Sequence, residues 1–543
     1  MAVNCSARLC IINELMRFTL LIAAASMCLA ADAHFDISYP KTANAGPITG
    51  RVYVMISRAT DREPRLQVGR VGVPFFGRDI EKLAPGQAAV IDATDLGSPV
   101  VSLTEIPAGE YQVQAFINVY SEFKRADGHT VWMHDDKWEG QRWNRSPGNL
   151  YSVVKKMTLD AKQGYRIALT CDQVIPPIPF PEDTEWVKRF RIESPLLTKF
   201  WGRPIYLGAT ILLPRDYAKS TEAYPVLYSQ GHFSTAAPMN FQPGREFAND
   251  WVKDNFPRML VVTFQHPAPY FDDSYAVNSV NLGPYGDAIM EELIPEIEKR
   301  FRVIKQPWAR LLAGGSTGGW EAMALELFHP DFFGGTWVYC PDSMDFSDVE
   351  GVDIYKDKNA FYKEFEWRKV PTINSREING QIRQTSEERN RFELVNGTHG
   401  RSGEQLDIWS AVFGPLGEDG YFKPMWDKRT GEMHPEVAKY WKDNYDLRYY
   451  MEKNWYTLGP KIVDKLHVFV GDADNFFLNN ATRKLQEWMK TTKDPHYEGS
   501  FVYGAAKGHC YSGPVGNSER LKEMAQYIMS KMPSDTVAGW WKP

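Results

Sequence analysis

The sequence predicts an α/β protein: a mostly parallel sheet covered by helices on both faces, preceded by a β-sandwich of immunoglobulin-like outline. Three observations support this. Short runs of alternating polarity fill residues 34–173, a proline-rich segment occupies residues 174–185, and buried apolar runs alternate with helical patterns in residues 186–543. Parallel strands need helical crossovers, so the last pattern indicates a sheet buried on both sides. We expect two folded units joined by a linker.

The N-terminus carries the pattern of a secretory signal. Residues 18–30 (FTLLIAAASMCLA) form an apolar run after Arg17, and Ala-Asp-Ala at residues 31–33 is a typical cleavage site. The run is shorter than the ~20 residues that span a bilayer as a helix. We expect a signal peptide at residues 1–33, a secreted or periplasmic protein, and no membrane anchor after cleavage. Met16 begins a more compact signal, so the choice of Met1 or Met16 as the start stays open.

The β-rich unit comes next along the chain. Its expected strands cover residues 51–57, 88–94, 110–120, 152–161 and 165–171. Period-two alternation with turns such as APGQ and PAGE is typical of a β-sandwich. The following segment, VIPPIPFPEDTE, contains four prolines and is expected to be a semi-rigid linker.

The second unit changes to an alternation of strands and helices. Its expected strands cover residues 186–192, 204–214, 225–229, 259–264, 309–313, 335–339, 466–470 and 499–503. Its expected helices cover residues 285–301, 319–328 and 518–532; the first places an apolar residue every four positions on one face. Between about residues 341 and 460 the alternation stops, and we interpret this polar, aromatic and irregular stretch as an insertion.

Charge and cysteine content exclude several classes of protein. The chain has 62 Lys plus Arg against 68 Asp plus Glu, which gives no electrostatic case for binding nucleic acid or an anionic membrane. Only Cys171, Cys340 and Cys510 lie outside the predicted signal, too few for a disulfide framework. Cys510 is interpreted as a small buried apolar residue. No Cys-x-x-Cys or His-Glu-x-x-His spacing occurs, so no metal is expected.

A nucleophile motif lies between an expected strand and an expected helix. Residues 314–318 read Gly-Gly-Ser-Thr-Gly, which is the G-x-S-x-G pattern in its required context. The sharp turn strains the backbone of Ser316, and small residues on either side avoid a clash. The helix N-terminus directs amide groups toward a developing oxyanion. We therefore predict that Ser316 is a catalytic nucleophile.

A serine nucleophile needs a histidine base that is oriented by a carboxylate. In α/β-hydrolases the order along the chain is serine, acid, histidine. The strand at residues 466–470 runs into Asp472 and Asp474, and the strand at residues 499–503 leads to His509. We predict His509 as the base and Asp474 as the acid, with Asp472 as the alternative acid.

The oxyanion hole needs two backbone donors. One is expected from Thr317, which follows the nucleophile. The other is expected from the segment Ser-Gln-Gly-His-Phe at residues 229–233, with the amide of His232 as first choice and that of Phe233 as second.

With these residues identified, the second half resembles the putative esterase family (esterase D and enterochelin-esterase-like) of the α/β-hydrolases. The matching segments are PVLYSQGHF, YGDAIMEELIPEIEKRF, ARLLAGGSTGGWEAMALELFHPDFFGG, VFVGDADNF and KGHCY. The resemblance implies a serine carboxylic-ester hydrolase with Ser316, Asp474 and His509 as its triad and with no metal or organic cofactor. Two features depart from the family: Gln230 replaces the usual histidine before Gly231, and the insertion is long.

The substrate is expected to be a carbohydrate-linked or small acyl ester; which ester, and the oligomeric state, stay open. An acyltransferase of the same fold is one alternative. The other is a surface protein that binds polysaccharide through residues 34–173 and has an inert hydrolase half. The rings of VWMHDDKWEGQRWNRSPGNLY suit sugar stacking, or pack on the second unit. Four tryptophans of the insertion are candidates for a substrate lid: Trp409, Trp426, Trp441 and Trp455.

Overall fold

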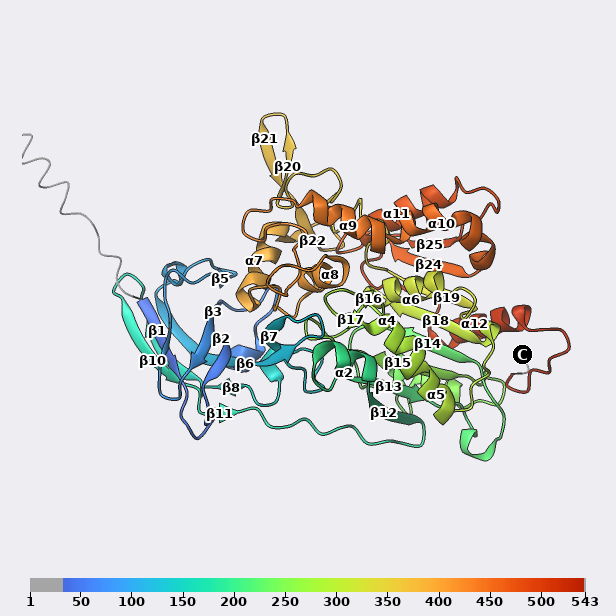
Figure 1. The fold of residues 1–543 in the computed structure, drawn as a ribbon, viewed down its shortest axis with the longest axis horizontal. Helices are drawn as coiled ribbons and strands as arrows, with labels where there is room; N and C mark the ends of the chain where they lie inside the picture. Colours follow the sequence, from blue (N-terminus) through green and yellow to red (C-terminus); the bar gives the residue numbers. More distant parts are fainter. Residues whose placement is uncertain (1–32, 542–543) are drawn as a thin grey trace, which may run out of the picture.

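The computed structural model describes residues 33–541, so the predicted signal peptide lies outside the described residues except for Ala33. Figure 1 shows two regions: the β-rich N-terminal part at one end and the α/β part at the other, with residues of the insertion above. Within residues 33–541, no helix has both the length and the apolar character needed to cross a lipid bilayer.

The N-terminal part contains two sheets. The smaller has the order β10 (Tyr165–Thr170), β1 (Ala33–Ser38), β4 (Ala89–Ile91). The larger has the order β11 (Gln173–Val174), β8 (Leu150–Tyr151), β6 (Gly109–Lys124), β2 (Ile48–Ser57), β3 (Phe75–Leu83), β5 (Gly97–Ser98), and β7 (Thr130–His134) and β9 (Lys155–Leu159) also pair with β6. Alternate residues of both sheets, among them Phe35, Val52 and Leu169, meet in one buried cluster. The apolar side of each strand is thereby removed from water.

The α/β part is built on an eight-stranded sheet. Its order is β12 (Val187–Glu193), β13 (Tyr206–Leu212), β15 (Leu260–Gln265), β14 (Val226–Gln230), β18 (Arg310–Gly315), β19 (Gly335–Tyr339), β24 (Leu466–Gly471), β25 (Ser500–Gly504). The pairs from β15 to β25 are parallel, whereas β12 and β13 are antiparallel additions at one edge. Residues 175–184 contain no helix or strand and connect the two parts.

Helices pack around this sheet. They are α2 (Pro195–Trp201), α3 (Glu246–Trp251), α4 (Tyr285–Ala288), α5 (Ile294–Arg300), α6 (Thr317–Phe328), α11 (Leu478–Met489) and α12 (Asn517–Lys531). The expected helix at residues 285–301 is interrupted by a π-helical segment, Ile289–Leu293, between α4 and α5. Pro295 in the first turn of α5 has no N–H to donate to the preceding turn, which accounts for the local change of helix type.

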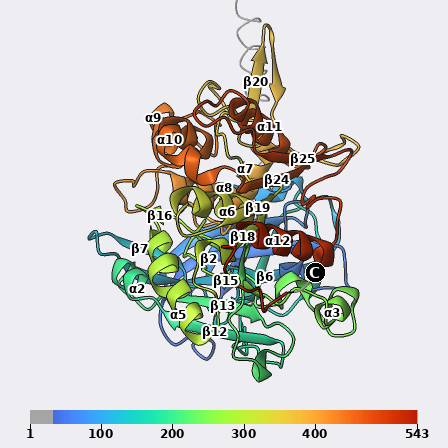
Figure 2. The same cartoon turned by 90° about the vertical axis from the view of Figure 1, so that its right-hand side faces the viewer.

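The insertion is more regular than the sequence pattern indicated. It contains the hairpins β20 (Tyr362–Phe365) with β21 (Arg368–Pro371) and β22 (Ile373–Arg376) with β23 (Ile382–Thr385), then α7 (Ser386–Asn396), α8 (Gln405–Phe413), α9 (Pro435–Tyr445) and α10 (Leu447–Ile462). The first hairpin projects from the molecule (Figure 2).

The prediction of an irregular insertion was therefore wrong, and α7 shows why. Polar side chains make up much of its buried surface: Arg389 pairs with Glu393 at 3.0 Å, and Lys428 reaches Glu393 at 2.6 Å. A helix that buries ion pairs lacks the apolar period by which a helix is recognised in sequence.

The insertion also connects to the N-terminal part. Phe392 and Val395 of α7 share a buried cluster with Tyr53 and Phe75 of the large sheet. Around this cluster, the Arg51 guanidinium donates to the carbonyl of Val395 at 3.0 Å. Asp79 accepts from Arg51 at 2.7 Å and from Arg401 of the insertion at 2.9 Å.

We expect Asp79→Asn to lower the free energy of unfolding by about 1–3 kcal/mol, because the two guanidinium groups lose their shared carboxylate. Burial acts to raise the pKa of Asp79, but Arg51 and Arg401 outweigh it and lower this pKa. The stabilisation is therefore present above the unfolded pKa of about 3.9 and is lost as the pH falls through the lower folded pKa.

Thermal unfolding of Asp79→Asn measures this effect, with Glu110→Gln as the control. Glu110 also has an ion-pair partner, Lys156 at 2.8 Å, but both side chains are exposed. Equal unfolding midpoints for the two variants would refute a role for Asp79 in joining the two parts.

Candidate active site

Ser316 occupies a strained turn between β18 and α6. Its backbone has φ 57° and ψ −125°, a conformation that residues other than glycine rarely adopt. A Cβ at Gly314 would lie 2.0 Å from the carbonyl oxygen of Gly318, and one at Gly318 would lie 2.2 Å from that of Gln230. The two glycines therefore allow the tight turn, as the motif predicts.

The structure brings Ser316, His509 and Asp474 together from three loops at the carboxyl ends of strands. His509 Nε2 lies 3.0 Å from Ser316 Oγ, and its Nδ1 lies 2.9 Å from Asp474 Oδ2. Asp474 is fully buried, and its other oxygen accepts from the amide of Phe476 at 2.8 Å. Asp472 instead accepts from the amide of Ala506 at 2.7 Å. The geometry thus distinguishes Asp474 from the alternative acid.

The surroundings of His509 favour its protonated form. Burial acts to lower its pKa, but hydrogen bonds and charges from Asp474 and Cys510 raise the pKa to about 10. The ring of Phe476 packs edge-on against the imidazole, with centroids 5.0 Å apart. An imidazolium cannot accept a proton from serine, so the groups around His509 control its use as a base.

Two of the predicted oxyanion donors, His232 and Phe233, follow β14, the strand next to the nucleophile strand β18, and the third, Thr317, directly follows Ser316. In the described part of the chain, the amides of Thr317, His232 and Phe233 have no hydrogen-bond acceptor. The His232 ring is held by Asp272 at 3.0 Å and Asp273 at 3.2 Å, and these carboxylates raise its pKa well above the ordinary value although burial opposes them. The side chain of Phe233 packs edge-on against Trp138 at 5.2 Å.

Sequence reasoning missed a buried carboxylate next to the nucleophile. Asp342 Oδ1 lies 3.4 Å from Ser316 Oγ. Its Oδ2 accepts hydrogen bonds from Tyr275 Oη at 2.5 Å, Thr317 Oγ1 at 3.1 Å and Gln405 Nε2 at 3.2 Å. Burial raises the pKa of Asp342. Asp342 follows β19, the strand next to the nucleophile strand, and this position in the sequence could have predicted it as a site residue. No such sequence pattern indicates Tyr275 or Gln405.

One of the four lid candidates reaches this network. The indole of Trp409 donates to Tyr275 Oη at 2.5 Å. The other three are core residues: Trp426 donates to Asn390 at 2.8 Å, Trp455 donates to the carbonyl of Pro495 at 3.0 Å, and Trp441 packs on Phe413 with 1% of its surface exposed. The lid prediction was therefore wrong for Trp426, Trp441 and Trp455, because an insertion of this size buries its rings in its own core.

A cavity of about 310 Å³ adjoins the site. His232 and Gln405 line it, and Gln405 Nε2 also donates to Thr317 Oγ1 and to Asp342 Oδ2 beside the nucleophile, each at 3.2 Å. The N-terminal part contributes Arg70 and residues 140–144, and the insertion contributes Phe392, Asn396 and Glu404. All three regions of the chain therefore form its wall.

The ring-rich segment of the N-terminal part faces inward. Trp143 stacks on Tyr53 with centroids 4.4 Å apart, and Trp138 packs on Phe233 of the α/β part. His134 bonds to Asn118 and Glu139, and Asp135 pairs with Arg203 at 2.6 Å. These contacts agree with the packing interpretation of the segment.

Two groups of side chains in the described residues bring three potential ligand atoms within 4.8 Å: His232 with Asp272 and Asp273, and Cys340 with His509 and Cys510. We assign no metal to either group. In each, the histidine already has carboxylate partners.

Comparison with known proteins agrees with the resemblance seen in the sequence. Residues 206–452 match the family model described as "Putative esterase", the family that the sequence resembles. A segment of 133 residues is 29% identical to a protein of Xylanibacter ruminicola named "Endo-1,4-beta-xylanase/feruloyl esterase". That match covers 23% of this chain and 18% of the relative.

Solved structures that match part of this chain include a ferulic acid esterase, which is 17% identical, with a TM-score of 0.33 and coverage of 63% of this chain and 98% of that chain. An S-formylglutathione hydrolase from Staphylococcus aureus is 12% identical, with a TM-score of 0.35 and the same coverage. One from Agrobacterium tumefaciens is 12% identical, with a TM-score of 0.32 and coverage of 64% and 95%.

Proposed function

We propose, from the premise that residues 206–452 form a domain of the esterase family, that this chain is a serine carboxylic-ester hydrolase acting through an acyl-enzyme. The observation that carries the proposal is the hydrogen-bond chain from Ser316 Oγ through His509 to Asp474. Each of these side chains is placed by a loop that follows a strand of the central sheet.

The mechanism follows from this geometry. Neutral His509 accepts the proton of Ser316 as Oγ attacks the ester carbonyl carbon, and Asp474 holds the Nδ1–H of the ring. The amides of Thr317 and His232 donate to the oxyanion that forms. The proton then passes from His509 to the leaving alcohol. His509 then accepts a proton from water, which attacks the acyl-serine carbonyl. The proton returns to Ser316 Oγ as the acid is released.

The substrate we propose is an ester that links a small acyl or aryl acid to a carbohydrate. The cavity next to the nucleophile combines amide and guanidinium groups with aromatic rings, which suits the hydroxyl groups and apolar faces of a sugar. The name of the Xylanibacter relative, which includes feruloyl esterase, supports the same class.

We also propose that residues 34–173, an immunoglobulin-like β-sandwich, are joined through the linker at residues 174–185 and supply part of this substrate wall. The alternative of an independent polysaccharide-binding module is less well supported, because Trp143 is buried against Tyr53 and Trp138 packs on Phe233 of the α/β part. The predicted signal at residues 1–33 supports a secreted or periplasmic location.

A panel of p-nitrophenyl, feruloyl and acetyl sugar esters tests this function on the purified chain. We expect release of the free acid, with a preference for sugar esters over simple alkyl esters. Addition of a sugar acceptor separates hydrolysis from the acyltransferase alternative, because transfer gives a new ester in place of the acid. Absence of hydrolysis across the panel would reject the proposal.

Arg142 provides a test of the cavity. We expect Arg142→Ala to raise KM for a sugar ester by roughly tenfold, the equivalent of one lost hydrogen bond to a charged group. For p-nitrophenyl acetate, which has no sugar for Arg142 to bind, kcat and KM should both stay unchanged. The matched control is Arg145→Ala, three residues further along and outside the cavity lining. Equal effects of the two substitutions on the sugar ester would contradict the proposed binding role.

A further inference from the structure

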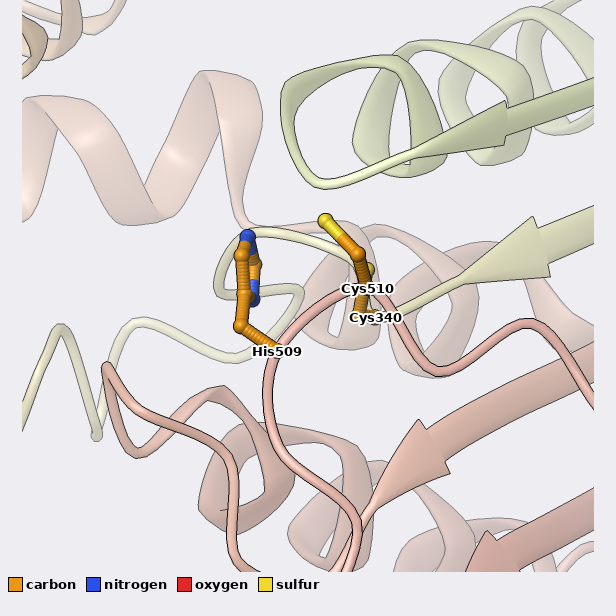
Figure 3. A group of neighbouring side chains, drawn as sticks. All are labelled: Cys340, His509 and Cys510. Atoms are coloured by element: carbon orange, nitrogen blue, oxygen red, sulfur yellow. The ribbon is translucent and has the colours of Figure 1, made fainter. Parts of the chain in front are cut away.

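Two cysteines lie beside the proposed base; Cys510 is its neighbour in sequence, whereas nothing in the sequence position of Cys340 indicates that it lies there. Cys340 directly follows β19, and Cys510 directly follows His509. Their sulfur atoms and a ring nitrogen of His509 all lie within 4.8 Å of one another. Figure 3 shows the two cysteine side chains close together with the imidazole to one side.

The backbone at both cysteines ties this pair to the nucleophile. Cys340 has φ 37° and Cys510 has φ 65°, conformations that are uncommon for residues other than glycine. The carbonyl of Tyr339, just before Cys340, accepts from the Ser316 amide at 3.0 Å, and the amide of Asp342 donates to the Ser316 carbonyl at 3.2 Å. Strained backbone of this kind persists where the surrounding structure holds it, most often at functional sites.

The two thiols differ in accessibility. Cys340 is fully buried, whereas Cys510 is exposed, which corrects the expectation that Cys510 is a buried apolar residue. Hydrogen bonds from Cys340 and His509 outweigh burial and lower the pKa of Cys510 to about 5, while the pKa of Cys340 is raised. Cys510 is thus an accessible thiolate, and Cys340 is a neighbouring thiol.

We propose that Cys340 and Cys510 form a reversible disulfide, and that its formation removes the thiolate that holds His509 in its protonated form. In the dithiol state, His509 is protonated: its Nδ1–H donates to Asp474, and the Cys510 thiolate lies within 4.8 Å of a ring nitrogen. In the disulfide state, Asp474 remains as the orienting carboxylate, and the ring is free to act as a base. This switch rests on the proposed function of His509.

A small-molecule disulfide such as oxidised glutathione supplies the oxidant. The Cys510 thiolate attacks one of its sulfurs, forms a mixed disulfide and releases one glutathione thiolate, which takes the proton of His509. Cys340 then attacks the Cys510 sulfur, breaks the mixed disulfide and releases the second glutathione thiolate, which takes the proton of Cys340. Two protein thiols are oxidised and one glutathione disulfide is reduced to two thiols. The two sulfurs, which lie within 4.8 Å of one another, approach to about 2.05 Å in the disulfide.

The charged groups around His509 determine the pH dependence. Asp474 faces it from the loop after β24, and Asp342 faces it from the loop after β19. Cys340 and Cys510 lie together on one side of the imidazole (Figure 3). Disulfide formation changes only the two cysteines. We therefore expect the acidic limb of kcat/KM to lie at lower pH for the oxidised protein, with activity on that limb about tenfold higher per pH unit of displacement.

The first measurement is independent of activity. The full chain is equilibrated with oxidised glutathione or with dithiothreitol, remaining thiols are alkylated, and the digest is mapped by mass spectrometry. We expect a disulfide-linked peptide pair containing residues 340 and 510 after oxidation only. The Cys171→Ser control should give the same pair, because Cys171 is buried in the N-terminal part. Absence of the linked pair would overturn the disulfide, even if ester hydrolysis depends on Ser316.

The second measurement compares pH profiles of ester hydrolysis for the two redox states. Cys510→Ser lacks the thiolate, so its acidic limb should match that of oxidised wild type under both conditions. Cys340→Ser cannot form the internal disulfide, so oxidised glutathione should leave its Cys510 as the stable mixed disulfide. That form also lacks the thiolate, so its limb should match oxidised wild type, while its peptide map shows a glutathione adduct at residue 510 and no 340–510 pair. If the linked peptide forms but both redox states have the same profile, the effect on His509 is overturned and the disulfide stands. If no hydrolysis is detected, the proposed function fails while the peptide map still decides the disulfide.

Discussion

Ser316→Ala is expected to lower kcat/KM for a p-nitrophenyl ester by a factor of about 10⁴ or more, because no other group can form the acyl-enzyme. The hydroxyl of Thr317, the residue after Ser316, donates to Asp342 at 3.1 Å, whereas the hydroxyl of Ser316 lies 3.0 Å from His509 Nε2. The strained backbone at Ser316 orients its Oγ toward His509 Nε2. Labelling by a fluorophosphonate probe should be lost in the same variant.

Thermal unfolding of Ser316→Ala controls for folding. We expect its midpoint to stay close to that of wild type, because the substitution removes one hydroxyl from a partly exposed residue and leaves the glycines of the turn in place. Hydrolysis or labelling that persists in a correctly folded variant would eliminate Ser316 as the nucleophile.

Asp474→Asn is expected to reduce kcat by roughly 10⁴ with a much smaller change in KM. An asparagine whose amide N–H donates to Nδ1 stabilises the wrong tautomer of His509. In that tautomer Nε2 already carries the ring proton, so Nε2 cannot accept a proton from Ser316. Because Asp474 is fully buried, water cannot replace its hydrogen bond to the ring, which is 2.9 Å long.

The matched control is Asp472→Asn, two residues earlier in the same loop. Asp472 binds the amide of Ala506 and does not contact the imidazole. We expect less than about a threefold change in kcat for this variant, in line with the loss of a partly exposed hydrogen bond. Larger losses from Asp472→Asn than from Asp474→Asn would reverse the assignment of the acid.

Local chemistry explains which parts of the site are predictable. The turn at Ser316 requires small neighbours, so its glycines mark it in the sequence, and the structure places that turn between β18 and α6 as expected. His509 and Asp474 follow strands whose apolar runs are short and clear, and parallel strands bring such loops to one edge of the sheet. Asp342 follows a similar strand and was missed because the expected triad left it without a role.

The errors arose where polar groups make up the interior. The helix α7 buries Arg389 and Glu393, so its pattern resembles a solvated loop. The tryptophans of the insertion were expected at a lid because aromatic side chains often contact substrates, but burying a ring in a core releases the same apolar surface from water. Composition cannot distinguish these two uses of a ring.

The sequence alone determined the order of strands and helices around the nucleophile, the esterase resemblance and the identities of Ser316, Asp474 and His509 as candidates, because each depends on short-range backbone geometry. Only the tertiary structure decided which residues surround them. Tyr275, Asp342 and Gln405 meet around Thr317 from three distant segments, the N-terminal part supplies residues 140–144 to the cavity, and Cys340 meets Cys510 across 170 positions of the chain. Such contacts arise from how whole elements pack and pair their buried polar groups, and no local pattern records them.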